Sequence, residues 1–340
     1  MGLPLREFVK PVVHIIKQND LFGKIVGVDT FNYLYAYLMA YTYSSGDILT
    51  NEENKTTTHL NVFFYKLIQM IELGIKPVFV FDGSKDTLKN ETVEERRKRA
   101  LDAEKKVNEL LKSGESWSAQ YKKSRAVSQR IKPYMIDDLK KLVAAFGFPV
   151  VNAEFEAESQ LAYMVSRGDI FCSASQDYDC VVYGSPIVVR NLFSSKKKEK
   201  ETGIEMIKFD EFIKHHEITK EQLVDISILA GNDFIDGVDG FGLRTAMKWI
   251  KEYSNIEKVI ANNDKVRKGI SIARMEQVRD LFLKPKINEN YKIEFKKPDL
   301  EEIEYQLVVE CNFDPTRVTR GLERLGKESP GKKQQFKRMF

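Results

Sequence analysis

NAEFEAESQLAYMVSRGDIFCSASQDYDCVVY, residues 152–183, holds two tight pairs of carboxylates. The first pair is Glu156 with Glu158, and the second is Asp177 with Asp179. Between the pairs lies a segment whose apolar residues recur with helical spacing, followed by a short apolar run of strand length. The stretch therefore predicts a helix and a strand of an α/β fold, each carrying one pair of acids.

The spacing within each pair limits how the carboxylates can meet. Side chains two residues apart share one side of an extended chain, so Asp177 and Asp179 can point together in a loop after the strand. On a helix, Glu156 and Glu158 converge only if they straddle its start. Carboxylates brought together raise each other's pKa, so a cluster that stays ionised needs a cation. Oxygen ligands alone favour Mg²⁺ or Mn²⁺ over zinc.

Two further strands nearer the amino terminus end in an acid. Lys24–Asp29 and Ile75–Gly83 each contain a buried apolar run, and the acids are Asp29 and Asp82. Open α/β sheets place ligands beyond the carboxyl ends of their strands. Asp29 taken alone is equally suited to cap the helix predicted after it. The repetition of strand and acid favours a shared site.

Other segments complete an alternation of helices and strands. Thr219, with Gln222 three residues later, forms the sequence signature of a helix start. The remaining predicted helices and strand are Thr30–Leu38, Thr58–Leu73, Tyr134–Ala145, Pro186–Arg190 and Thr219–Leu229.

The segment Lys89–Lys132 departs from the rest in composition. Basic residues exceed acids there, and Gly114–Ser118 interrupts two helical stretches. With little apolar surface to dock on a core, this segment is expected to project. Lys89 and Arg96 are two helical turns apart and share one face, although ordinary surface charge also explains them.

A glycine-rich hairpin follows the helix that starts at Thr219. Gly237, Gly240 and Gly242 stand immediately before the helical segment Leu243–Ile250. Such a turn exposes backbone N–H groups beside a helix start and can hold a phosphate of any sequence. Glycine turns between helices are common, so this signal gains weight only beside the others.

Composition sets the class of molecule and its partner. The 340 residues are 42% hydrophobic and 31% charged, the balance of a soluble globular protein. No apolar run suits a membrane span or a signal peptide, and three cysteines without paired spacing favour a reducing compartment. Cys172 and Cys180 are expected in the core. The net charge of +4 is unevenly spread in basic clusters, which fits a polyanionic partner.

These segments together resemble the flap endonucleases, structure-specific 5′ nucleases of replication and repair. The similarity runs from Gly2 to about Ile250, and the compact length and Ser175-Gln176 are more like archaeal members. The motifs that carry it are Val28-Asp29, Thr57–Gly83, Glu156-Ala157-Glu158, Ala174–Cys180 and Leu229–Phe234.

The resemblance implies an α/β fold with a mostly parallel central sheet flanked by helices, a helical arch and a helix-hairpin-helix element. The implied regions are a nuclease region at 1–98, the arch at 89–132, an internal nuclease region at 133–255 with the helix-hairpin-helix at 219–252, a helical part at 256–325 and a tail at 326–340.

The resemblance also implies roles for particular residues. Two Mg²⁺ ions per subunit, replaceable by Mn²⁺, are expected, and Asp177 is counted as catalytic as well as a ligand. Lys89 and Arg96 are expected to face the scissile phosphate, while Tyr35 stacks near the junction. The implied ligands are Asp29, Asp82, Glu156 and Glu158 for one ion, and Asp177, Asp179 and Asp233 for the other. The implied DNA contacts are Gly2, Tyr35, Lys89, Arg96, Gly237, Gly240, Gly242 and Arg244.

The expected activity is cleavage of DNA carrying a 5′ flap, with 5′-3′ exonuclease activity, in Okazaki fragment processing and repair. The expected protein is a monomer of the cytoplasm, or of the nucleus in a eukaryote, that contacts no membrane. A sliding clamp is a further expected partner through residues 334–340. The family pattern is altered at Glu154-Phe155, at Leu243 and Arg244, and in the clamp peptide. There Lys337 takes the aliphatic place, and Phe340 alone fills one of the two aromatic places.

Three other functions remain open at this stage. A related 5′ nuclease could prefer gaps or bubbles. A non-catalytic junction binder would be expected to lack some of the seven acids, all of which are present. A phosphatase with an Asp-x-Asp nucleophile accounts for Asp177 and Asp179 but leaves the glutamates and the hairpin unexplained.

Overall fold

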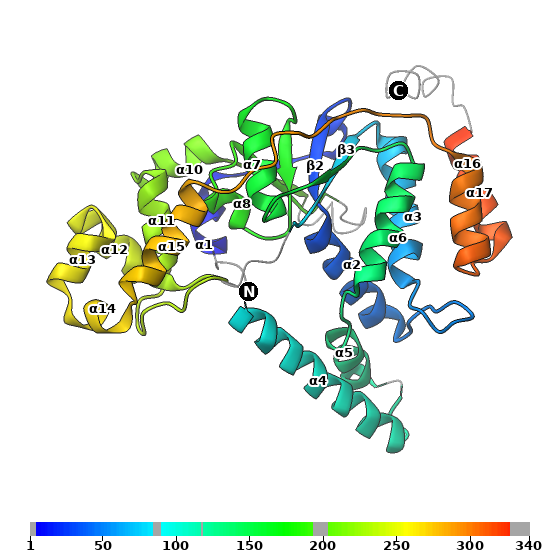
Figure 1. The fold of residues 1–340 in the computed structure, drawn as a ribbon, viewed down its shortest axis with the longest axis horizontal. Helices are drawn as coiled ribbons and strands as arrows, with labels where there is room; N and C mark the ends of the chain where they lie inside the picture. The colour runs from blue at the N-terminus through cyan, green and yellow to red at the C-terminus, as the bar shows by residue number, and fades with distance from the viewer. Residues whose placement is uncertain (1–4, 84–89, 117, 193–202, 327–340) are drawn as a thin grey trace.

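A mixed β-sheet with helices on both faces forms the centre of the computed structural model, which describes residues 5–83, 90–116, 118–192 and 203–326 (Figure 1). Within these residues the sheet has seven strands in the order β1-β7-β6-β5-β2-β3-β4. The predicted α/β class is confirmed. The strands are β1 (Val13–Ile16), β2 (Ile25–Asp29), β3 (Lys76–Phe81), β4 (Val150–Asn152), β5 (Cys172–Ala174), β6 (Ile187–Arg190) and β7 (Ile204–Lys208).

Most of the sheet is parallel. β2 pairs in parallel with β3 and β5, and β3–β4 and β5–β6 are parallel as well. β7 runs antiparallel to both β6 and β1 at one edge. Parallel neighbours are joined by crossover helices, so the carboxyl ends of β5, β2 and β3 lie side by side at one edge.

The sheet separates two apolar cores, and the central strands are buried on both sides. Val26 and Val28 of β2 are buried against α2 and α3, whereas Val78 and Val80 of β3 face the core on the opposite side. This accounts for their near-continuous apolar sequence. The helices of the α2 side are α2 (Thr30–Ser45), α3 (Thr58–Leu73) and α6 (Pro133–Ala145), and those of the other side are α1 (Arg6–Val9), α7 (Ala157–Ser166), α8 (Asp179–Val182), α10 (Phe209–His216) and α11 (Lys220–Ala230). Short 3₁₀ turns lie at η1 (Lys10–Val12) and η2 (Gln18–Leu21).

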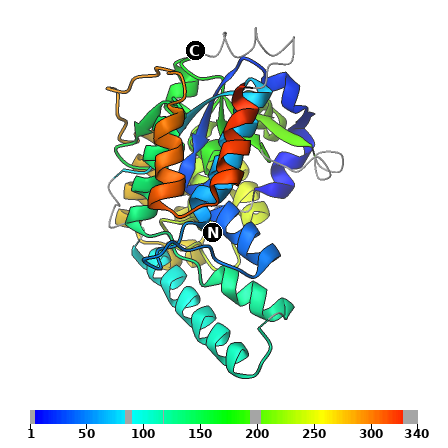
Figure 2. The same ribbon diagram turned by 90° about the vertical axis from the view of Figure 1, so that its right-hand side faces the viewer.

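Two helices project from this body, as the composition of that segment predicts (Figures 1 and 2). They are α4 (Asn90–Lys112) and α5 (Ala119–Val127). Their joint contains Gly114 at φ +78, a left-handed conformation that favours glycine. The base of the pair is held at α5, where the Lys122 ammonium donates to the Ser44 carbonyl at 3.2 Å.

A helical bundle lies at the far end of the molecule from α16 and α17 (Figure 1). α11 begins after Thr219, whose hydroxyl accepts from the Gln222 N–H while the Gln222 side chain accepts from the Thr219 N–H, as predicted. The other helices of the bundle are α12 (Leu243–Tyr253), α13 (Ile256–Asn262), α14 (Asp264–Gly269) and α15 (Ile272–Leu283).

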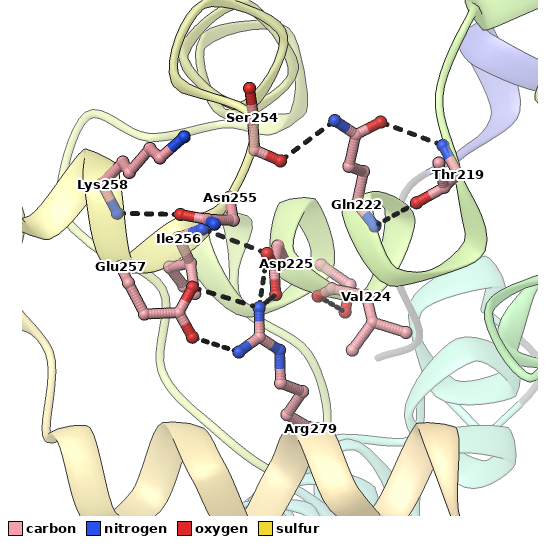
Figure 3. A network of polar contacts seen from close by, with 11 residues as sticks. Thr219, Gln222, Val224, Asp225, Ser254, Asn255, Ile256, Glu257, Lys258 and Arg279 are labelled. Atoms are coloured by element: carbon pink, nitrogen blue, oxygen red, sulfur yellow. Dashed lines mark hydrogen bonds and ion pairs between the residues drawn. The ribbon is translucent and has the colours of Figure 1, made fainter.

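An ion network built on the buried Asp225 joins three helices of this bundle (Figure 3). Arg279 of α15 reaches both carboxylate oxygens of Asp225 on α11, at 2.7 and 2.8 Å, and also pairs with Glu257 of α13. The Ile256 N–H donates to the same Asp225 carboxylate at 3.0 Å. Asp225 therefore positions α13 and α15 against α11.

An irregular connector crosses the molecule after α15 and reaches the last helices (Figure 1). Asn288 exchanges two hydrogen bonds with the buried Gln160 side chain of α7, each at 2.9 Å. Further along, the Lys296 N–H donates to the Gly147 carbonyl at 2.8 Å. The chain ends in α16 (Leu300–Glu304), the π-helical turn η4 (Tyr305–Glu310) and α17 (Pro315–Gly326), which pack on the α3 side.

Cys172 and Cys180 are buried free cysteines, as predicted. Among the helices of the described residues, none combines the length and the apolar character needed to cross a bilayer.

Candidate active site

The carboxyl ends of three neighbouring strands bring acids together at one edge of the sheet. The register pairs Asp29 of β2 with Val80 of β3, and Asp82 follows two residues later. On the other side of β2, Val28 pairs with Ala174, the residue before the loop that carries Asp177. Positions far apart in sequence thus meet because parallel strands end together.

Asp29 is the most enclosed of these acids, with 1% of its surface exposed. One carboxylate oxygen accepts from the Asn32 N–H at 3.1 Å, so Asp29 caps α2. The other oxygen accepts from the Ser175 hydroxyl at 2.9 Å, in the loop after β5. The sequence left open whether Asp29 is a helix cap or part of an acidic site, and the structure places it in both situations.

Asp82 follows β3, and its side chain lies against the start of α7. Its carboxylate accepts from the Ala157 N–H at 2.9 Å, where the positive end of the helix dipole favours a negative charge. The chain can come this close because residue 83 is a glycine: a Cβ there would stand 2.2 Å from the Ala153 carbonyl oxygen. The Asp82 carboxylate is thereby held beside the first acid pair, Glu156 and Glu158.

Glu156 and Glu158 straddle the start of α7, the arrangement that their spacing requires. Glu156 occupies the position before the helix and Glu158 lies in the first turn. Glu156 is buried, and its Oε2 accepts a hydrogen bond of 2.8 Å from the Tyr183 hydroxyl.

The second acid pair differs from the simple extended loop of the sequence prediction. Asp177 lies in the loop, where its carboxylate accepts from the Tyr178 N–H at 3.0 Å. Asp179 is instead the first residue of α8, and it is buried. The short helix α8 therefore begins between Asp177 and Asp179, and Tyr183 follows directly after it.

Asp233 reaches the region from the helical bundle. It follows the end of α11 and is buried. The ring of the next residue, Phe234, lies 6.0 Å from the ring of Phe155, which immediately precedes Glu156. Asp233 is thus carried by a segment that packs directly on the segment leading into the first pair.

The acids affect one another electrostatically. Burial, with a further contribution from Asp82 and Asp177, raises the pKa of Asp29 to about 7, although its hydrogen bonds to Asn32 and Ser175 act in the opposite direction. Burial likewise raises the pKa of the Cys180 thiol, to which Glu158, Asp29, Asp179 and Asp177 contribute. Carboxylates from β2, from the residue after β3, from α7 and α8, and from the loop after β5 therefore act on one another electrostatically.

This environment fits a divalent cation by its chemistry. The side chains are oxygen donors, and among the described residues the charges that act most on Asp29, those of Asp82 and Asp177, are negative. Among the described His, Cys, Asp and Glu residues, no three are arranged as a ready-made metal cage. Mg²⁺ does not require one, since it commonly keeps several waters and uses one or two carboxylates together with substrate phosphates.

The residues expected to contact DNA are placed only in part. Tyr35 projects from α2 with 45% of its surface exposed, and Arg244 is exposed in the first turn of α12. Gly240 has φ +82, and Gly242 directly precedes α12, so the glycines form the tight turn between α11 and α12. Gly2, Lys89 and residues 334–340 lie outside the described residues, as does the side chain of Arg96.

Sequence reasoning missed the groups that hold the acids. The Ser175 hydroxyl and the Asn32 backbone N–H donate to Asp29, and the Asn32 side-chain oxygen accepts from the Gln176 N–H at 2.9 Å. Tyr183 binds Glu156. The one available signal was position, because Ser175 lies two residues before Asp177 and Tyr183 lies one helical turn after Asp179.

Comparisons with known proteins agree with this architecture. The family profile of the XPG N-terminal domain matches residues 1–104, and that of the XPG I-region matches residues 147–233. Flap endonuclease 1 of Staphylothermus marinus is 38% identical over 337 residues, spanning 96% of this chain and 95% of that protein.

Solved structures show the same fold. Flap endonuclease-1 from Methanococcus jannaschii superposes with a TM-score of 0.72 at 29% identity, covering 95% of this chain and 98% of that one. The catalytic core of Rad2 in complex with DNA substrate gives a TM-score of 0.71 at 18% identity, over 96% and 100% of the two chains. At that identity the likeness concerns the fold alone.

The α/β fold, the acids at its strand ends and the XPG regions define the class: a nuclease, which hydrolyses phosphodiester bonds of DNA. Nucleases of this class depend on metal ions. Within the class, the chain belongs to the flap endonuclease 1 family and is a structure-specific 5′ nuclease.

Proposed function

We propose that the seven acids hold two divalent ions, Mg²⁺ in the cell with Mn²⁺ as a substitute, and that DNA is cut at the edge of the sheet where they meet. Asp29, Asp82, Glu156 and Glu158 would surround one ion, with one or two of them in direct contact and the others acting through water. Asp177, Asp179 and Asp233 would bind the other, partly through water.

The observation that carries this proposal is the environment of Asp29. A buried carboxylate facing Asp82 and Asp177 is destabilised in its ionised form, and its pKa rises to about 7. A structural role alone would favour a partner of opposite charge or an amide in its place. The arrangement is useful when positive charge arrives with a bound metal ion.

Bound divalent ions would supply an activated water and neutralise charge on the phosphate in the transition state. The chain itself supplies orientation. Ser175 and Asn32 fix both oxygens of Asp29, and the Ala157 N–H holds one oxygen of Asp82. Because these donors are backbone groups or short side chains, the carboxylates are held before substrate arrives.

Groups outside the acidic centre would position the DNA. The turn containing Gly237, Gly240 and Gly242 presents backbone N–H groups at the start of α12, a sequence-independent grip on a duplex phosphate. Tyr35 would stack on a base at the junction. Lys89 and Arg96 would neutralise charge on the scissile phosphate.

The substrate proposed is branched DNA with a 5′ flap, cut near the junction of single and double strand, with 5′-3′ exonuclease activity on related ends. The setting is Okazaki fragment processing and repair in the cytoplasm of an archaeal-like cell. The protein would act as a monomer, and a sliding clamp that binds residues 334–340 is the further partner proposed.

Cleavage of a labelled 5′-flap duplex with and without Mg²⁺ tests the proposal. Asp177→Asn should reduce the rate by about 10³-fold, since a metal ligand loses its charge. Asp210→Asn, at an exposed position of α10, is the matched control and should cut at the wild-type rate. Wild-type activity in Asp177→Asn would contradict the proposed ligand set.

A substrate panel tests the preference for flaps. The same duplex with a gap, a bubble or a blunt 5′ end should be cut more slowly than the flap. Faster cleavage of gaps or bubbles would instead identify the related 5′ nuclease activity that the sequence also allows.

A further inference from the structure

Tyr183 lies between the two acid pairs. It follows α8, and its N–H donates to the carbonyl of Asp179 one turn earlier at 2.9 Å. Its hydroxyl reaches the other pair and donates to Glu156 Oε2 at 2.8 Å. One side chain therefore connects the segment that begins with Asp177 to the start of α7.

The phenol remains a hydrogen-bond donor. Tyr183 is buried, and burial raises its pKa well above the ordinary value, with Glu158, Asp179 and Asp82 acting in the same direction.

The ring of Tyr183 is fixed from behind by α15. It lies 4.7 Å from the ring of Phe282, and Phe282 is in turn 5.6 Å from Phe234, the neighbour of Asp233. These rings are buried, so the hydroxyl cannot follow Glu156 if that carboxylate turns away. The direction of the hydrogen bond is set by the packing of the bundle.

We propose that Tyr183 is a positioning residue for the metal centre: by holding Oε2 of Glu156, it presents the other oxygen, Oε1, as the ligand. This inference rests on the proposed function, because it takes Glu156 as a metal ligand. Partners that orient ligating carboxylates from behind typically change metal affinity or activity by about 10- to 100-fold when removed.

The central test is Mn²⁺ binding to the DNA-free protein, with free Mn²⁺ measured by electron paramagnetic resonance. Tyr183→Phe keeps the ring against Phe282 and removes the hydroxyl alone. The dissociation constant for Mn²⁺ should rise about tenfold. In flap cleavage, the Mg²⁺ concentration for half-maximal rate should rise by a similar factor, while the rate at saturating Mg²⁺ stays within about threefold of wild type.

Tyr291→Phe is the matched control. Tyr291 donates its hydroxyl to the Asp169 carboxylate, a contact of the same kind at the carboxyl-terminal end of α7. Its loss should leave Mn²⁺ affinity unchanged. Unchanged Mn²⁺ affinity in Tyr183→Phe would overturn the inference, even if the melting temperature in EDTA falls, because the hydroxyl would then be structural.

Glu156→Gln separates this inference from the proposed function. It should weaken Mn²⁺ binding, and Tyr183→Phe in the Glu156→Gln background should weaken it no further, since Tyr183 acts through that carboxylate. A further tenfold loss in the double variant would overturn the role of Tyr183. If Glu156→Gln binds Mn²⁺ as tightly as wild type does, Glu156 is not a metal ligand. The assignment in the proposed function is then wrong, and so is the role inferred for Tyr183.

Discussion

The acidic edge of the sheet and the helical bundle each contain a buried aspartate with 1% of its surface exposed, and the two have opposite surroundings. Asp29 faces Asp82 and Asp177, and burial with these charges raises its pKa to about 7. Asp225 faces Arg279; burial raises its pKa to about 6, and the guanidinium counteracts that rise.

The difference separates a functional charge from a structural one. Asp225 has its cation built into the chain, so its network is complete in the folded protein (Figure 3). Asp29 receives neutral donors from Ser175 and Asn32, and its nearest named charges are negative. Burying the ionised Asp29 beside other carboxylates costs free energy of folding. A bound cation or a proton would remove that cost.

Asp29→Asn should produce the largest effect, in opposite directions on activity and stability. Cleavage of the flap substrate should slow by about 10³-fold. At pH 8 the buried Asp29 carboxylate is ionised at a cost, because its pKa is about 7. The variant should therefore melt at a higher temperature than wild type in EDTA at pH 8, with a smaller difference at pH 5. If Asp29→Asn melted at a lower temperature than wild type at pH 8, Asp29 would be a stabilising residue like Asp225, and the difference drawn between the two would be wrong.

Arg279→Met should have the next largest effect, on stability. Removing the cation leaves Asp225 buried without a positive partner and beside Glu257, which should lower the free energy of unfolding by about 3 kcal/mol at pH 7.5. Arg267→Met is the control, since Arg267 pairs with Asp264 at the exposed surface of α14, and it should change stability by under about 0.5 kcal/mol. Urea unfolding in EDTA measures both, and equal effects would show that Asp225 needs no partner.

The pH dependence of stability gives a smaller effect. The raised pKa of Asp225 means that the folded protein binds its proton more tightly than the unfolded chain between about pH 4 and pH 6. Stability from this group is thus present below pH 4 and lost as the pH rises through 6. Relative to Asp225→Asn, wild type should lose on the order of 2 kcal/mol between pH 4.5 and pH 7. A constant difference across that range would show that the pKa is not raised.

Glu257→Gln should give the smallest effect. The Glu257 side chain is 52% exposed, and the amide can still accept from Arg279. The free energy of unfolding should fall by under about 1 kcal/mol, and less at high salt. A loss as large as that of Arg279→Met would place the energy of the network on the exposed pair and not on Asp225.

Local pattern alone predicted much of the fold. Thr58–Leu73 forms a helix with the predicted bounds, and the Thr219 cap with Gln222 is present. Strands ending at Asp29 and before Asp82 also follow from short apolar runs. These features depend on residues a few positions apart, so one stretch of sequence contains all the information that they need.

The amino-acid sequence by itself thus determined which acids stand at strand ends and helix starts, and which family they indicate. Only the tertiary structure decided what those acids meet. Ser175 reaches Asp29 across 146 positions, Tyr183 reaches Glu156 from the end of α8, and Arg279 neutralises Asp225 but not Asp29. A side chain's charge is local, whereas its burial and partners depend on how distant segments pack, and these set its pKa and its role.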